Sequence, residues 1–193
     1  MPPLVVVQGA REMDAWVTWG MFVAWLVHDA EELITMPGWA ARHVPGLRQR
    51  WPRVPDRFWS RLEPSRAQVT LAVVLMGVFV LVAAADGART GGSSTLFQAV
   101  LIGFGVHGVG HLGQSVLTRG YTPGVITAPL IVIPFSVLAW QAVDRAGVVA
   151  PGLGDALLPA LVLLPVLLAG VQLLSALVLR LVPAVTASRS LLR

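Results

Sequence analysis

The sequence predicts an all-α fold: a polytopic transmembrane helical bundle of about five spans. Hydrophobic residues make up 55% of the chain and charged residues only 12%, with a mean hydropathy of +0.73. A typical soluble domain is about a quarter charged. The apolar residues also come in long blocks rather than in alternating or amphipathic patterns. We therefore expect residues 1–193 to form a single integral membrane domain.

The apolar blocks set the expected spans, because about 20 apolar residues are needed to cross the hydrocarbon layer. The expected spans cover residues 14–36, 67–85, 95–117, 123–143 and 155–180. Pro123 is expected in the first turn of the fourth helix, where proline is favoured. Residues 37–66 are too rich in arginine to span and too interrupted by proline to form one long helix.

The distribution of the arginines predicts the orientation of the chain. All 14 basic residues are arginine, and the five-span arrangement puts 11 of them on one side: Arg42, Arg48, Arg50, Arg53, Arg57, Arg61, Arg66, Arg119, Arg180, Arg189 and Arg193. Arg11, Arg89 and Arg145 lie on the other side. The positive-inside rule then predicts that the N-terminus is outside and the C-terminus cytoplasmic. The expected location is the cell inner (plasma) membrane, as a multi-pass protein. The Arg/Trp-rich loop 37–66 is expected to lie on lipid headgroups, so membrane lipid rather than nucleic acid is the expected partner.

Ionisable residues interrupt the first predicted span. The segment WLVHDAEELITMP places His28, Asp29, Glu31 and Glu32 where apolar residues are expected. Such residues are costly within a membrane, and their default interpretation is functional. On a helix, His28, Glu31 and Glu32 share one face, and Asp29 lies about a quarter-turn away.

A pair of histidines interrupts the third predicted span. His107 and His111 are four residues apart, the spacing at which two imidazoles on a helix reach one metal ion. At 1.5 Å per residue, both sets of polar residues lie roughly 6 to 16 Å from the cytoplasmic ends of their spans. We therefore expect the two spans to form one site. Glycines at 103, 105, 108, 110 and 113 permit close packing of this span against its neighbours.

These positions suggest roles for ten residues. The expected metal ligands are His28, Glu32, His107 and His111, because the chain contains no cysteine and any metal must use histidine and carboxylate. Glu31 and Asp29 are the candidate catalytic acid/base groups. Four residues from the end of the third span and the turn after it are candidates for substrate binding: Gln114, Ser115, Arg119 and Tyr121.

Two segments resemble a known family. HDAEE matches the pattern His-x-x-Glu-Glu, and HLGQSVLTRGYTPGVIT is similar to a second signature, in which a histidine helix runs into a Ser, Arg, Tyr, Pro, Gly turn. The sequence thus resembles the HXXEE family of small bacterial integral membrane proteins. The resemblance implies that His28, Glu31, Glu32 and His111 are motif positions, and it implies no particular reaction.

The residues leave several functions open. A divalent ion such as Zn²⁺, Fe²⁺ or Mn²⁺ with an open position would favour a membrane-embedded, metal-dependent hydrolase acting on a lipophilic small molecule. Two metals would permit a di-iron oxidase or desaturase, although such bundles usually supply four carboxylates. Without metal, the cluster suits an acid/base isomerase or cyclase, a proton-coupled carrier or a structural ion-pair network.

Overall fold

The computed structural model describes residues 14–59, 62–152, 154, 166 and 169–179. All regular structure within these residues is helical, which confirms the predicted all-α fold. The helices are α1 (Ala15–Arg50), α2 (Asp56–Trp59), α3 (Arg66–Arg89), α4 (Thr95–Thr118), the π-helix η2 (Ala128–Val132) and α5 (Ile133–Arg145). A further helix covers Ala169–Leu179, and most of the predicted span 155–180 lies outside the described residues.

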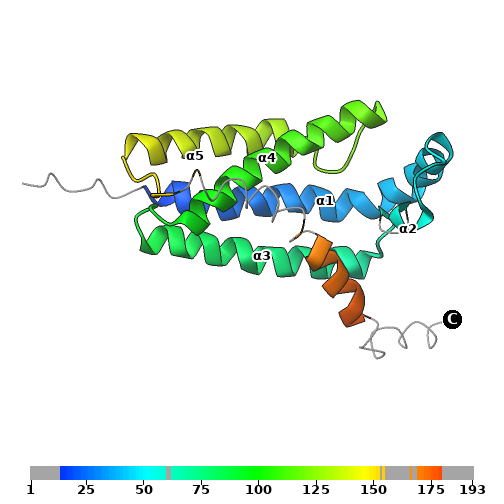
Figure 1. The fold of residues 1–193 in the computed structure, drawn as a ribbon, viewed down its shortest axis with the longest axis horizontal. Helices are drawn as coiled ribbons and strands as arrows, with labels where there is room; N and C mark the ends of the chain where they lie inside the picture. Colours follow the sequence, from blue (N-terminus) through cyan, green and yellow to red (C-terminus); the bar gives the residue numbers. More distant parts are fainter. Residues whose placement is uncertain (1–13, 60–61, 153, 155–165, 167–168, 180–193) are drawn as a thin grey trace, which may run out of the picture.

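Helix α1 is longer than expected. The first predicted span ends at residue 36, but α1 continues through Pro37 and Pro45 to Arg50, so the first part of the predicted loop 37–66 is helical. A proline lacks the N–H group for one helical hydrogen bond, yet a helix can continue past it with a kink. The far end of α1 turns away from the bundle axis and packs on α2 (Figure 1) through Ala40, Val44 and Trp59.

Side-chain caps explain where α3 and α4 begin. The Ser65 hydroxyl accepts from the Gln68 N–H while the Gln68 side chain accepts from the Ser65 N–H, forming a capping box. Ser94 caps α4 by accepting from the Phe97 N–H. At the other end of α4, Arg119 adopts a left-handed conformation with a φ of 56° and stops the helix.

The fourth predicted span begins later than expected. Residues 123–126 form a turn, and the first residue of η2 is Ala128, so the expectation that Pro123 lies in the first turn of the helix is wrong. The π-helix bond from the Ile133 N–H to the Ala128 carbonyl fits a segment in which Pro129 and Pro134 lack donors.

The bundle has α1 between two neighbours. Helix α3 lies along one side of α1 and α5 lies on the other, while α4 runs obliquely from the end of α3 toward α5 (Figure 1). Gly77 of α3 lies under the Trp25 indole, where an added Cβ would be 2.7 Å from Cη2. Gly108 of α4 lies against Val132 and Ile133. The glycines of α4 thus favour contact with η2 and α5 rather than with α1.

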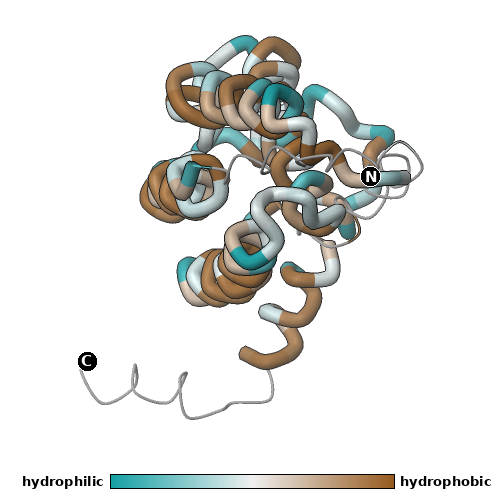
Figure 2. Tube along the Cα trace, turned by 90° about the vertical axis from the view of Figure 1, so that its left-hand side faces the viewer, coloured by the Kyte–Doolittle hydropathy of each residue, from teal (hydrophilic) through white to brown (hydrophobic). Residues whose placement is uncertain are grey.

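The outer surface is apolar. Helices α3 and α4 are the two described helices that are long and apolar enough to cross a membrane. Figure 2 shows that hydrophobic residues make up much of each helix, and the large hydrophobic side chains that are exposed include Val74, Val78, Val109, Val116 and Leu130. Exposed apolar surface of this extent marks a contact with lipid or protein.

Candidate metal centre

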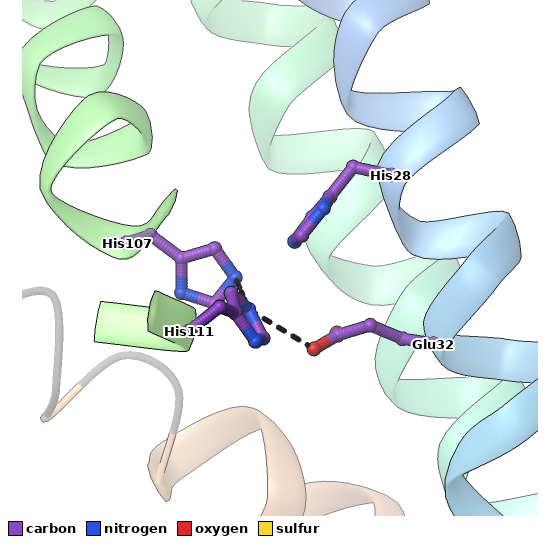
Figure 3. A group of neighbouring side chains, drawn as sticks. All are labelled: His28, Glu32, His107 and His111. Carbon is purple, nitrogen blue, oxygen red and sulfur yellow. Dashed lines mark hydrogen bonds and ion pairs between the residues drawn. The ribbon is translucent and has the colours of Figure 1, made fainter. Parts of the chain in front are cut away.

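Four side chains from α1 and α4 converge on one point. His28 and Glu32 project from α1, and His107 and His111 project from α4 toward them (Figure 3). One ligand atom from each residue can be chosen so that all four lie within 4.8 Å of one another. The ring centroid of His28 is 4.8 Å from that of His111 and 5.2 Å from that of His107.

His111 lies at the centre of this group. Its Nε2 is 2.9 Å from Nε2 of His107 and 3.2 Å from Oε1 of Glu32. Two ligands on a tetrahedral zinc ion are about 3.3 Å apart, given metal–ligand bonds of about 2.0 to 2.1 Å. Both distances from Nε2 of His111 are therefore close to the spacing of two ligands on one ion.

Two imidazole nitrogens in the cluster are buried without a partner. Nε2 of His28 and Nδ1 of His111 have no partner with good hydrogen-bond geometry among the described residues, although the imidazole of His111 lies near the backbone carbonyl of Pro123. The exposed fractions of these residues are 0% and 3%. A buried polar atom without a partner costs free energy and calls for an explanation. An ion bound by Nε2 would satisfy His28.

The other nitrogen of His28 is held in place. Nδ1 of His28 lies 2.7 Å from the Thr127 hydroxyl, which donates over 2.7 Å to Oε2 of Glu31. Glu31 also accepts from the Thr127 N–H over 2.9 Å, and its Oε1 accepts from the Tyr121 hydroxyl over 2.9 Å and from the Ile126 N–H over 3.4 Å. The carboxylate of Glu31 is therefore fully hydrogen-bonded to residues 121–127. It lies outside the ligand cluster, which consists of His28, Glu32, His107 and His111.

A tight turn covers the two imidazoles. The Val125 N–H donates to the Thr122 carbonyl, Pro123 occupies the second position, and Gly124 has a φ of 83°. These features are those of a type II turn, which requires a positive φ at its third position. An added Cβ on Gly124 would lie 2.7 Å from Cε1 of His111 and 2.9 Å from Cε1 of His28.

The remaining predicted site residues lie around this centre. Asp29 is buried beside Glu32 and forms no hydrogen bond or ion pair with the described residues. Ser115 donates to the Gly120 carbonyl and closes the turn after α4, while the side chains of Gln114 and Arg119 are exposed. The Tyr121 hydroxyl donates to Glu31, and desolvation raises the pKa of Tyr121 above its usual value, so the hydroxyl stays protonated. The roles assigned to these residues remain predictions.

The sequence analysis gave neither Thr127 nor Gly124 a role in the site. The Pro-Gly pair at 123–124 is a turn signal and was available in the sequence. Nothing in the local sequence marks Thr127, since its contact with His28 joins residues that are 99 positions apart. The fourth histidine, His43, stacks on Trp39 outside the cluster.

Comparison of the chain with known proteins identifies the family that carries the His-x-x-Glu-Glu motif. No curated protein and no solved structure matches the chain. A family model described as "protein of unknown function with HXXEE motif" matches residues 19–139, which include His28, Glu31, Glu32, both α4 histidines and Thr127. This match covers more than half of the chain, so the protein belongs to the HXXEE family.

Proposed function

We propose that His28, Glu32, His107 and His111 bind one divalent metal ion, and that the protein is a membrane-embedded hydrolase that uses it. The convergence of four ligand atoms within 4.8 Å carries this proposal. The unpartnered Nε2 of His28 supports it independently, because this buried atom gains a partner when an ion binds.

The donor set indicates which ions would fit. Three imidazoles with one carboxylate suit Zn²⁺ or Fe²⁺. The sequence has no cysteine, so no thiolate ligand is available. Such an ion lowers the pKa of a bound water and polarises a carbonyl or phosphoryl oxygen. The protein's own residues would hold the ion between α1 and α4 and fix the orientation of the imidazoles.

A hydrolase fits the cluster better than a di-iron oxidase does. Di-iron bundles usually supply four carboxylates, and Glu32 is the one carboxylate in the described ligand cluster. The four hydrogen bonds to Glu31 argue against a free base at that position. Asp29, buried and without a hydrogen bond to the part of the chain that the structure describes, is the remaining acidic candidate for proton transfer.

One observation favours a second candidate. Nε2 of His111 is within hydrogen-bonding distance of His107 and of Glu32, so the three side chains form a continuous acid/base chain without metal. Such a chain supports an isomerase or cyclase. Metal binding distinguishes the two functions.

The location of the cluster suggests a lipophilic substrate. The cluster lies beside α4, one of the two described helices that could cross a membrane, and the outward faces of α3 and α4 are apolar. We place the protein in the plasma membrane as a multi-pass protein, with its N-terminus outside and the arginine-rich end of α1 cytoplasmic. The arginine distribution supports this orientation.

Metal analysis of detergent-purified protein tests the proposal. We expect about one equivalent of zinc or iron in the wild type, a large loss in His111→Ala and Glu32→Gln, and no loss in the control His43→Ala, whose imidazole lies outside the cluster. The purified protein should also release metal-dependent hydrolysis products from a total lipid extract, detected by mass spectrometry. The metal-dependent hydrolase would be overturned if wild-type protein contained no metal after gentle purification and still bound none after incubation with Zn²⁺ or Fe²⁺.

A further inference from the structure

We propose that Thr127 and Glu31 are positioning residues that keep a proton on Nδ1 of His28 and so present Nε2 to the metal ion. This inference rests on the proposed function, because presenting Nε2 of His28 matters only if a metal ion binds there. The hydrogen-bond pattern itself is independent of that function. It assigns different tasks to the two adjacent glutamates of the motif: Glu32 lies in the ligand cluster, and Glu31 orients a ligand through Thr127.

Counting protons along the chain of contacts gives the direction of each hydrogen bond. An ionised carboxylate only accepts, and a hydroxyl has a single proton. Glu31 receives two backbone N–H groups and two hydroxyls, a set of donors that suits the ionised form. The Thr127 proton therefore lies toward Oε2 of Glu31, and the Thr127 oxygen must accept from Nδ1–H of His28.

The reverse arrangement leaves contacts without protons. If the Thr127 hydroxyl donated to His28, its oxygen would face Oε2 of Glu31 at 2.7 Å with no proton between them. The alternative acceptor of the hydroxyl, the Gly124 carbonyl, is 3.4 Å away. The Nδ1–H tautomer of His28 is the one that satisfies both short contacts, and it leaves the lone pair on Nε2.

That lone pair belongs to the atom that lacks a partner. Nε2 of His28 is fully buried, faces the two α4 histidines (Figure 3) and has no hydrogen bond among the described residues. Metal-binding histidines generally donate their other N–H to a carboxylate, carbonyl or water, and loss of such a partner weakens metal affinity about 10- to 100-fold. Here the Thr127 hydroxyl lies between the two groups: it accepts from His28 and donates to the carboxylate of Glu31.

Titration with Co²⁺ tests the pair in full-length protein. Thr127→Val keeps the shape and removes the hydroxyl, so we expect its Kd for Co²⁺ to rise about 10- to 100-fold. Glu31→Gln places an amide N–H₂ against donors and should weaken binding similarly, whereas Thr127→Ser should restore affinity close to the wild type. The control is Thr118→Val, which removes a similar hydroxyl whose bond goes to the Gln114 carbonyl.

Nitrogen-15 NMR of metal-free protein labelled at histidine separates this inference from the proposed function. We expect His28 as the Nδ1–H tautomer in the wild type and in Thr127→Ser, and a shift toward Nε2–H in Thr127→Val. Those spectra in a protein that binds no Co²⁺ would support the positioning pair and overturn the hydrolase. Tight Co²⁺ binding that is equal in the wild type, Thr127→Val and Glu31→Gln would overturn the positioning pair and leave the hydrolase standing.

Discussion

Gly124 lies so close to His111 that a methyl group added to it would be 2.7 Å from Cε1 and 2.8 Å from Nδ1 of the imidazole. The positive φ of Gly124 adds a second cost for any other residue. We expect Gly124→Ala to destabilise the protein by about 1–3 kcal/mol and to weaken metal binding. The measurements are thermal unfolding in detergent and Co²⁺ titration. Gly120→Ala is the control, because an added Cβ there meets no atom within 4 Å, and equal effects of the two changes would contradict this interpretation.

Metal should stabilise the folded protein. A ligand that binds only the native state at 100 times its Kd adds about 2.7 kcal/mol. For a chain of this size, that corresponds to a rise in Tm of roughly 5–10 °C. Adding Zn²⁺ to chelator-treated wild type should produce this rise, measured by differential scanning fluorimetry. His111→Ala should show no rise, and a rise of the same size in that variant would point to binding elsewhere.

Gln98 joins the α3–α4 turn to the segment after α5. Its side chain is fully buried, donates to the carbonyls of Gly92 and Val148, and accepts from the Ala150 N–H. Gln98→Leu leaves these backbone groups without partners and should cost about 2–4 kcal/mol. Gln141→Leu, at an exposed position of α5, should have little effect on unfolding. A loss in Gln98→Leu no larger than in the control would show that water replaces the missing bonds.

Close packing of Gly77 under Trp25 should limit what α3 tolerates. We expect Gly77→Val to push the indole aside and to lower stability by about 1–3 kcal/mol through overpacking. Gly110→Val makes the same change in α4 where no neighbour lies within 4 Å. Comparing unfolding of the two variants in detergent removes the shared effect of helix propensity. Equal stabilities would mean that Trp25 moves at no cost.

The orientation of the chain can be tested with single cysteines, because the native sequence has none. Arg53→Cys lies in the exposed turn after α1, and Ser93→Cys lies in the exposed turn between α3 and α4. A membrane-impermeant maleimide added to intact cells should label residue 93 and leave residue 53 unlabelled until the cells are opened. The opposite pattern would reverse the proposed topology.

The sequence predicted those features that depend on local composition. The helical class and the positions of α3 and α4 follow from apolar blocks of span length, and the spacing of His107 and His111 places them on one face. The far end of α1 could not be predicted, because proline usually interrupts a helix. Pro37 and Pro45 instead lie within a helix whose end is supported by packing of Ala40 and Val44 against Trp59.

The supporting contacts of the site could not be predicted in the same way. Glu31 has the same spacing to His28 as a second ligand would, and only the tertiary structure brings Thr127 and Tyr121 to its carboxylate. Hydrogen bonds between such distant residues depend on how α1 packs beside the turn before η2. The sequence pattern therefore picked out the four residues that converge in the structure, whose role as metal ligands stays a prediction, but it gave Glu31 the role of a free base, which the geometry does not favour.

The separation of 99 positions between His28 and Thr127 also sets an order of events during synthesis. At about 5 to 20 residues per second, the ribosome makes Thr127 roughly 5 to 20 s after His28. During that interval Glu31 lacks all four of its hydrogen-bond donors, since each of them lies in residues 121–127. Until residues 121–127 have been made, the carboxylate of Glu31 therefore depends on other donors, such as water.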